Sequence, residues 1–248
     1  MKVQVFGQTD TGKLRSGNED SILVAPQFGL GVVCDGMGGH EAGEVASKTA
    51  VDSIFAWFNE GGDDGSHFGL DPALPGAARR LASAILYADQ AIRTAAQVPG
   101  RQGMGTTVVA AMVDGNTLYV GHAGDSRAYM GRGRAMMQVT QDHSVVGDLL
   151  RAGIITEAQA VHVKKNAITR ALGVTDNLVV DVDAVAVQPG DTFLLCSDGL
   201  HGLVPDEAIG AHLCGGQELP DSCRNLIDAA NAAGGSDNIS TVLLRVEA

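Results

Sequence analysis

The sequence LGVVCDGMGGH, residues 30–40, decides how this 248-residue chain folds. Its apolar half is typical of a buried β-strand, which ends at Asp35 just before a glycine-rich turn. Three further segments place an aspartate at or beside a strand-like apolar run: Arg15–Asp20, Ser197–Gly199 and Ser236–Asn238. We expect the strand ends to bring these carboxylates to one place. Because grouped carboxylates repel one another, the pattern predicts a site that holds more than one cation.

Length and charge limit the classes of protein to which the chain belongs. With 248 residues, of which 45% are hydrophobic and 19% charged, one large globular domain is favoured over two. The 17 basic and 29 acidic residues give a net charge of −12, which disfavours a nucleic-acid partner. The N-terminus alternates like a strand instead of forming a secretory leader, and no run approaches the roughly 18 apolar residues of a membrane span. We therefore expect a cytoplasmic protein that does not enter the membrane.

Hydrophobic periodicity predicts an α+β fold. Val51, Ile54, Phe55 and Phe58 recur at helical spacing after Gly43 and are predicted to face the core. Helices are predicted near residues 44–58, 81–92, 205–213 and 221–233. Strands are predicted near residues 2–8, 21–25, 30–34, 106–113, 117–122, 127–129, 179–187, 192–196 and 239–246. Because the strands come in hairpins and the helices in pairs, we expect stacked antiparallel sheets covered by helices, not a doubly wound parallel sheet.

Residues from about 143 to 170 differ from their surroundings. Two short helices are predicted within this stretch, at 145–150 and 156–160, and the basic residues Lys164, Lys165 and Arg170 follow them. We interpret the stretch as a small inserted subdomain.

The residue types of the predicted site favour a hard divalent cation. The lack of a side chain at Gly36 lets its carbonyl oxygen approach a ligand. Oxygen ligands from carboxylates, a carbonyl and water suit Mg²⁺ or Mn²⁺, whereas zinc prefers histidine or thiolate. Two such ions about 3.5–4 Å apart activate a shared water for attack on phosphorus, and the planar guanidinium of Arg15 matches two phosphate oxygens. The sequence thus predicts metal-assisted hydrolysis of a phosphate ester, with Arg15 and Asp35 as catalytic residues and Arg15 binding the phosphate.

Taken together, the motifs resemble those of the metal-dependent Ser/Thr protein phosphatases, the PPM or type 2C family, in its compact bacterial branch. The resemblance spans essentially the whole chain and is carried by Arg15–Asp20, Asp35–Glu44, Gly105–Thr107, Gly124–Arg127, Thr169–Gly173, Ser197–Leu200 and Ser236–Asn238. An Asp-Gly dipeptide at the end of a strand is most often a simple turn, and Asp198-Gly199 or Asp237-Asn238 alone is compatible with that. The whole set of motifs, in this order along the chain, is what indicates the family. The resemblance implies one catalytic domain over residues 1–248. It also implies a four-layer α-β-β-α sandwich, with two central antiparallel sheets flanked by helix pairs and the insert at about 143–170 as a flap.

The resemblance also implies a role for each candidate site residue. The metal ligands that it implies are Asp20, Asp35, the carbonyl of Gly36, Asp125, Asp198 and Asp237. Asp35 would bridge two ions of Mn²⁺ or Mg²⁺, and Asp125 would serve a third, weaker one. Further candidates beside the ligands or the substrate are Glu19, Asn238 and, near the exit of the flap, Arg170.

One position departs from the eukaryotic members of the family. They carry a histidine, thought to protonate the leaving alkoxide, where this chain has Met37. A serine leaving group still needs a proton, so water or another side chain must supply it. His40 is nearby in sequence and is a candidate for this task or for a structural role. The other histidines are expected to have core, capping or surface roles.

The expected activity is hydrolysis of phosphoserine and phosphothreonine in proteins. The expected partners are phosphorylated proteins, among them a Ser/Thr kinase and its substrates, and the chain is expected to be a monomer. One alternative is a catalytically silent phosphoprotein-binding module on the same fold, although such relatives usually lose metal-binding carboxylates and this chain keeps them. Another is a two-metal phosphoesterase of nucleotides or nucleic acid, which the acidic balance disfavours.

Overall fold

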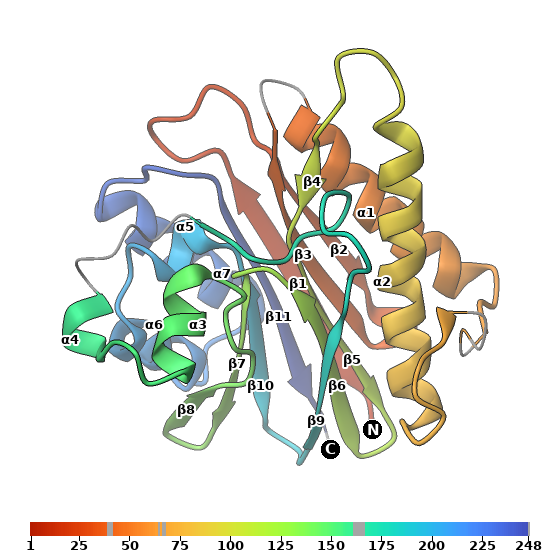
Figure 1. Ribbon diagram of the computed structural model, residues 1–248. Coiled ribbons are helices and arrows are strands. Elements are labelled where there is room, and N and C mark those ends of the chain that lie inside the picture. Colours follow the sequence, from red (N-terminus) through yellow and green to blue (C-terminus); the bar gives the residue numbers. More distant parts are fainter. Residues whose placement is uncertain (39–41, 64, 66–67, 161–166, 248) are drawn as a thin grey trace.

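Two antiparallel β-sheets stacked face to face form the centre of the protein, as the computed structural model shows (Figure 1). The structure describes residues 1–38, 42–63, 65, 68–160 and 167–247. In strand order, the first sheet consists of β1 (Val3–Asp10), β11 (Ile239–Val246), β10 (Thr192–Cys196), β7 (Arg127–Arg132) and β8 (Ala135–Gln138). The second consists of β2 (Asp20–Ala25), β3 (Leu30–Met37), β5 (Val108–Asp114), β6 (Thr117–Ala123) and β9 (Asp181–Ala186), with β4 (Gly105–Thr106) paired to β3.

Helices cover the outer face of each sheet. The second sheet is covered by α1 (Ala42–Asn59) and α2 (Gly76–Ala95). The first is covered by α6 (Asp206–Leu213) and α7 (Leu219–Ala232), and the short α5 (Asp198–His201) begins directly after β10. The predicted α+β, four-layer α-β-β-α sandwich with flanking helix pairs is therefore confirmed. Among the described residues, no helix has the length and apolar character needed to cross a membrane.

The stretch interpreted as an insert lies beside this sandwich (Figure 1). It contains the short helices α3 (Val145–Arg151) and α4 (Glu157–Ala160), close to their predicted positions. Ser144 and Ile168 pair as an isolated β-bridge near its two ends. We call residues 143–170 the flap. Lys164 and Lys165, which were singled out for their charge, lie outside the described residues.

Alternation along β3 places its residues in two different cores. Val32 and Cys34 are buried beneath the outer helices, whereas Val33 is buried between the two sheets. A strand covered on both faces reads as a continuous apolar run, which explains the unbroken pattern of residues 30–34. By the same alternation, Asp35 follows Val33 onto the side between the sheets.

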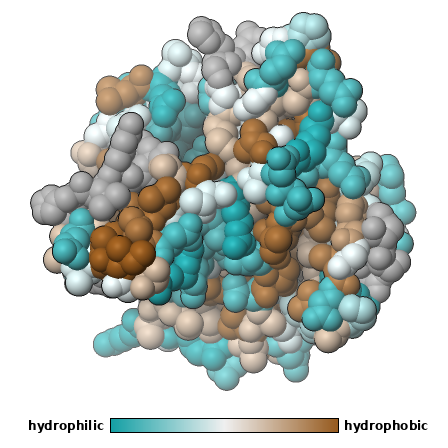
Figure 2. Space-filling model, in the orientation of Figure 1, coloured by the Kyte–Doolittle hydropathy of each residue, from teal (hydrophilic) through white to brown (hydrophobic). Residues whose placement is uncertain are grey.

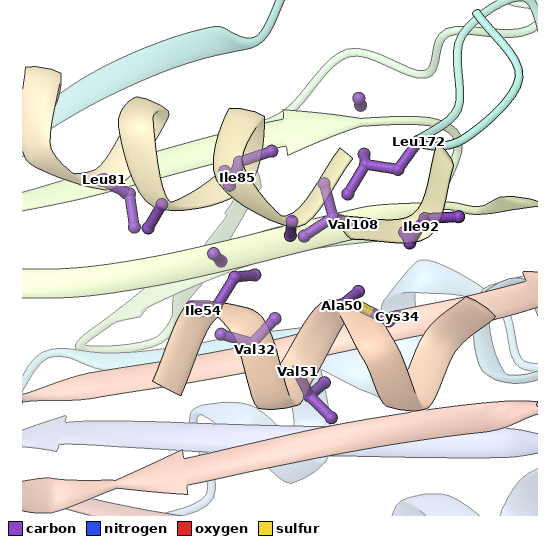
Figure 3. Packing of buried hydrophobic residues seen from close by; sticks show 14 of the residues in the cluster. Val32, Cys34, Ala50, Val51, Ile54, Leu81, Ile85, Ile92, Val108 and Leu172 are labelled. Carbon is purple, nitrogen blue, oxygen red and sulfur yellow. The ribbon is translucent and has the colours of Figure 1, made fainter. Parts of the chain in front are cut away.

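The outer core joins α1 and α2 to the second sheet (Figure 3). Ile54 of α1 is fully buried there, as are Leu81 and Ile85 of α2. On the sheet they meet the equally buried Val32 and Val108. Burial of each such aliphatic side chain stabilises the fold by about 1.5–3 kcal/mol. This packing fixes the strand that carries Asp35.

The predicted inner face of α1 is correct apart from Phe55. Val51, Ile54 and Phe58 are at most 4% exposed, but Phe55 is 36% exposed. A residue at the edge of an apolar stripe keeps one side in solvent, and the Phe55 ring contacts that of Phe28 at a centroid distance of 6.4 Å. The prediction thus made the buried stripe one residue too wide.

Four short elements of the described residues have no predicted range of their own. They are β4, β8, α5 and the 3-10 helix η1 (Pro26–Phe28). None exceeds four residues, so none contains the repeat on which a prediction from periodicity depends.

Candidate active site

Asp20 and Asp35 lie opposite each other on neighbouring strands. The antiparallel register of β2 and β3 pairs the two residues directly. The main chain of Asp35 is fixed from the loop before β5, where its N–H donates to Thr107 Oγ1 at 3.0 Å. Its carbonyl accepts from Thr107 N–H and from Thr106 Oγ1, each at 2.9 Å. The second sheet therefore presents two carboxylates together at one end of the core between the sheets.

The first sheet supplies Asp198 from the start of α5, directly after β10, and Asp237 from the turn before β11. The pairing of these strands continues beyond β10, where the N–H of Ser197 donates to the carbonyl of Ser240 at 3.2 Å. A Cβ on Gly199 would lie 1.9 Å from a carbonyl oxygen of the facing turn, so only glycine allows the two turns to approach this closely. Asp198 and Asp237 consequently line the same cleft.

A direct hydrogen bond joins the two sheets at Asp20. This residue is only 6% exposed, and its Oδ2 accepts from the hydroxyl of Ser197 at 2.7 Å. Its other carboxylate oxygen, Oδ1, is buried without a hydrogen-bond partner among the described residues. A buried carboxylate oxygen of this kind is unfavourable unless a donor or a cation contacts it. The environment of Asp20 therefore fits a bound divalent cation.

The pKa values show that the predicted carboxylates converge. Loss of solvent raises the pKa of Asp35 well above its usual range, and four neighbouring carboxylates raise it further. Those neighbours are Asp20, Asp198, Asp125 and Asp237. Loss of solvent likewise raises the pKa of Asp20 and that of Asp125 to about 7. Divalent cations would neutralise this repulsion and make the ionised carboxylates favourable.

Asp125 lies in the turn after β6. His201 of α5 donates from Nε2 to the main-chain carbonyl of Asp125 at 3.0 Å, which ties the turn to the first sheet. On the other side, the hydroxyls of Ser126 and Thr107 are hydrogen-bonded at 2.8 Å. Loss of solvent and then the charge of Asp198 raise the pKa of Asp125, and both carboxylates line the same cleft. Both sheets thus contribute to the position of this carboxylate.

Gly36 has no room for a side chain. A Cβ there would lie 2.2 Å from the carbonyl oxygen of Gly43 and 2.5 Å from that of Glu19. The N–H of Gly36 also donates to the Glu19 carbonyl at 3.1 Å. The Glu19 carboxylate in turn lies against Gly43, where a Cβ would be 2.4 Å from Oε2. Both glycines are therefore required for the loop before β2 to pack against the start of α1.

Arg15 and Asn238 connect the loop before β2 to the turn before β11. Arg15 Nη2 donates to Asp237 Oδ2 at 2.7 Å while half of its side chain stays exposed. Asn238 Oδ1 accepts from the N–H of Glu19 at 2.8 Å, and its Nδ2 donates to two carbonyl oxygens of the loop at 2.9 Å each. Asn238 is therefore a structural link, whereas Arg15 places a cationic group at the rim of the carboxylates.

Three other residues singled out by the sequence lie apart from the carboxylates or outside the description. Arg170 forms an ion pair with Asp181 at 2.7 Å. His40 lies outside the described residues. Met37 ends β3, and its terminal methyl lies 3.1 Å from the position that a Cβ on Gly105 would occupy. The side chain at the position of the family's histidine thus packs against β4.

Sequence reasoning missed two residues that orient the carboxylates. Ser197 donates to Asp20 across the two sheets, and Thr107 binds both main-chain polar groups of Asp35. Both residues stand in motifs that carry the family resemblance, Ser197 next to Asp198 and Thr107 at the end of Gly105–Thr107, which were the available signals. The contacts themselves join segments far apart in the chain, so local patterns do not reveal them.

A cleft of about 710 Å³ opens beside the carboxylates. Its lining includes Asp125, Asp198 and Asp237 and, from α3 of the flap, Val146 and Leu150. Figure 2 shows apolar surface gathered over the flap helices next to strongly polar surface. The cleft has the size of a ligand-binding site and joins a charged end to an apolar one.

Comparison with known proteins identifies the family. A family model described as protein phosphatase 2C matches residues 12–239. The chain belongs to the protein phosphatase 2C family. The match confirms the resemblance that the motifs indicated.

Other members of the family are similar to this chain in sequence and in structure. The serine/threonine phosphatase stp of Listeria innocua is 36% identical over 242 residues, which cover 96% of this chain and 93% of that protein. The crystal structure of the serine/threonine phosphatase PstP/Ppp of Mycobacterium tuberculosis has a TM-score of 0.85 at 32% identity, and 99% of each chain is covered. The catalytic domain of PstP in complex with two manganese ions has a TM-score of 0.82 at 33% identity, again with 99% coverage of both chains. The fold therefore accommodates divalent metal ions.

Proposed function

We infer that this chain hydrolyses phosphoserine and phosphothreonine in proteins and uses divalent cations to do so. The observation that supports this most directly is the convergence of four carboxylates on Asp35, with the half-exposed guanidinium of Arg15 beside them. The similarity to proteins named serine/threonine phosphatases supports the same activity.

We propose that two divalent ions bind between the sheets and that a third binds more weakly. The proposed ligands are Asp35 for both main ions, Asp198 and Asp237 for one, Asp20 and the Gly36 carbonyl for the other, and Asp125 for the third. Oxygen ligands of this kind suit Mn²⁺ or Mg²⁺. When bound, such ions lower the pKa of water and polarise a phosphoryl group.

The side chains around the ligands bind and orient the phosphate ester. Arg15 is proposed to bind two phosphate oxygens through its planar guanidinium while Asp237 holds it at the rim of the site. Ser197 fixes the orientation of Asp20. The leaving alkoxide needs a proton that Met37 cannot donate, so we propose that water in the cleft donates it.

We propose that residues 1–248 form one catalytic domain with residues 143–170 as the flap. Because the cleft reaches from the carboxylates to α3, the peptide segment next to the phosphorylated residue is proposed to lie against the flap. The substrates are proposed to include a Ser/Thr kinase and the proteins that it phosphorylates, and the enzyme is proposed to act as a monomer.

The activity is tested with a phosphothreonine peptide in the presence of Mn²⁺. Asp35→Asn and Asp198→Asn each remove a ligand charge and are expected to lower kcat about 100-fold or more. Asp52→Asn, at an exposed position on α1, is the matched control and should retain the wild-type kcat. Near wild-type turnover by both site variants would contradict the proposal. Tight peptide binding without turnover by the wild type would identify a silent binding module instead.

A further inference from the structure

A second group of polar side chains lies at the base of the flap, apart from the proposed metal ligands. His122 is the next-to-last residue of β6 and Asp181 is the first residue of β9, and the antiparallel register of the two strands pairs these residues directly. His143 stands where the flap begins, and Arg170 stands where it ends. Both histidines are 2% exposed. The proposed chemistry assigns no task to this group.

The hydrogen bonds of His143 determine which ring nitrogen carries its proton. Nδ1 faces the N–H of Gly124 at 3.2 Å and must accept from it, so Nδ1 has no proton. The proton of the neutral ring therefore resides on Nε2, which donates to Asp181 Oδ2 at 3.0 Å. Asp181 Oδ1 accepts from Arg170 Nη1 at 2.7 Å. A continuous relay thus runs from Gly124 through His143 and Asp181 to Arg170.

The electrostatics agree with this assignment. Burial lowers the pKa of His143, which favours the neutral ring that the relay requires. Partial burial alone would raise the pKa of Asp181, but hydrogen bonds from His143 and Arg170 outweigh it and lower that pKa. A neutral histidine between an N–H donor and a carboxylate therefore persists at neutral pH.

The main chain of His143 joins the same segments. Its N–H donates to the Gly124 carbonyl at 2.9 Å, and its own carbonyl accepts from Thr169 N–H at 2.8 Å. Residue 143 is therefore bonded to the turn that carries Asp125 and to the other end of the flap. Gly124 has a φ of +118°, and a Cβ there would lie 2.6 Å from Thr107 Cβ, so only glycine fits at this position of the turn.

The spacing of this group also fits a metal site, but its hydrogen bonds do not. One potential ligand atom from each of His122, His143 and Asp181 lies within 4.8 Å of the others, and His122 Nδ1 is buried without a hydrogen-bond partner among the described residues. However, both nitrogens of His143 are already engaged, and the cation of Arg170 contacts Asp181. The two imidazole rings also stack, with centroids 4.6 Å apart and planes inclined by 9°. The arrangement is that of a hydrogen-bond relay.

We propose that His143, oriented by Asp181 and Arg170, is a positioning residue that fixes the turn carrying Asp125 to the base of the flap. This inference rests on the proposed function in one respect, namely that Asp125 holds a cation. The relay makes the geometry of Asp125 depend on the attachment of the flap. Its loss should weaken cation binding at Asp125 without removing any ligand.

Two amide substitutions separate the two halves of the relay. With asparagine at position 143 in the rotamer of the histidine, the side-chain oxygen takes the place of Nδ1 and still accepts from the N–H of Gly124. With glutamine at this position, the side-chain nitrogen takes the place of Nε2 and donates toward Asp181. His143→Asn should therefore keep the bond to the turn, and His143→Gln should lose it. His212→Asn, on α6 outside the cleft, is the matched control.

The first measurement uses the full-length protein without metal. Two-dimensional ¹H–¹⁵N spectra of the wild-type histidine rings should show the proton of His143 on Nε2. Amide hydrogen exchange at Gly124 should be at least tenfold faster in His143→Gln than in the wild type, in His143→Asn or in the control. A proton on Nδ1, or equal exchange in both His143 variants, would overturn the proposal. Displacement of the Nε2 proton by added Zn²⁺ would overturn it as well and identify a metal site.

The second measurement is a Mn²⁺ titration by calorimetry and by turnover. His143→Gln should weaken the weakest Mn²⁺ site about tenfold, in the range typical of residues that orient metal ligands, and raise the Mn²⁺ concentration that gives half-maximal rate. His143→Asn should stay closer to the wild type. Unchanged Mn²⁺ binding in His143→Gln would overturn the positioning role. An inactive wild type would refute the proposed function, whereas the proton position and the exchange rates would still report on the relay.

Discussion

Replacement of Asp20 by asparagine is expected to stabilise the metal-free protein, although it alters a proposed metal ligand. Asp20 is 6% exposed, and loss of solvent raises its pKa from 3.8 to about 7. Asparagine has nearly the same shape, carries no charge and still accepts the hydrogen bond from Ser197. The substitution therefore removes a buried charge and keeps the packing and the bond between the sheets.

The size of the effect follows from the two pKa values. A carboxyl group whose pKa is higher in the folded protein than in the unfolded chain destabilises the folded state above the folded pKa, and the penalty disappears below the unfolded pKa. The difference between 3.8 and about 7 corresponds to at most roughly 4 kcal/mol for Asp20. Near pH 8, we therefore expect Asp20→Asn to raise the free energy of unfolding by about 1–4 kcal/mol, with Tm rising about 2–4 °C per kcal/mol. Near pH 4.5, about a quarter of the gain should remain.

Urea denaturation in EDTA at the two pH values measures this difference. Burial lowers the pKa values of His122 and His143, so these two residues contribute a loss of stability as the pH falls, but this contribution is common to the variant and the wild type and cancels between them. Asp52→Asn, which removes only an exposed ion pair with Lys48, should change stability by no more than about 0.5 kcal/mol at either pH. With Mn²⁺ at 100 times its Kd, the wild type should gain about 2.7 kcal/mol and the variant less. A variant that is less stable than the wild type at pH 8 in EDTA would contradict the predicted cost of burying the Asp20 charge.

Three further predictions concern the surroundings of the carboxylates. Arg15→Lys should lower kcat/KM for a phosphothreonine peptide about 10- to 100-fold at saturating Mn²⁺, because an ammonium group cannot match two phosphate oxygens. An unchanged kcat/KM would exclude Arg15 as the residue that binds the phosphate. Gly199→Ala should weaken Mn²⁺ binding measured by calorimetry, because the added Cβ would lie 1.9 Å from a backbone oxygen. Gly76→Ala is the control, because a Cβ there meets no atom within 4 Å. Equal Mn²⁺ affinities of the two variants would contradict the role of close packing at Gly199. Ser197→Ala removes the hydrogen bond to Asp20 and should lower the affinity for Mn²⁺ about 10- to 100-fold. The free energy of unfolding should also fall by about 1–2 kcal/mol. A loss of stability without a loss of Mn²⁺ affinity would show that Ser197 has a structural role only.

The sequence was sufficient wherever one segment defines the feature. Asp35 was predictable because an apolar strand buried on both faces ends at this residue, and alternation from Val33 then places the carboxylate between the sheets. The inner faces of the long helices were predictable for the same reason, since a helical repeat needs only its own residues. Phe55 shows the limit, because its exposure depends on where the neighbouring elements end.

Contacts between distant segments were beyond such reasoning. Ser197 and Asp20 are 177 positions apart, and nothing around either residue indicates the bond between them. The relay of His143 and Asp181 depends in the same way on the register of β6 and β9 and on the return of the chain through the flap. A serine or a histidine alone is compatible with a cap, a core or a surface position, and only the assembled fold selects among them.

The location of the carboxylates at the end of the core between the sheets explains why cations should affect both catalysis and folding. One sheet contributes Asp20 and Asp35 and the other contributes Asp198 and Asp237, so their mutual repulsion acts across the sheets. The hydrogen bond of Ser197 to Asp20 opposes this separation, but the pKa of Asp20 stays raised even with that bond in place, because of the loss of solvent and also because of the charges of Asp198 and Asp237 on the other sheet. The apolar core must therefore hold the sheets together until cations bind. Cation binding then changes a net repulsion between the sheets into an attraction, so the ions that would activate water would also stabilise the sandwich that holds them.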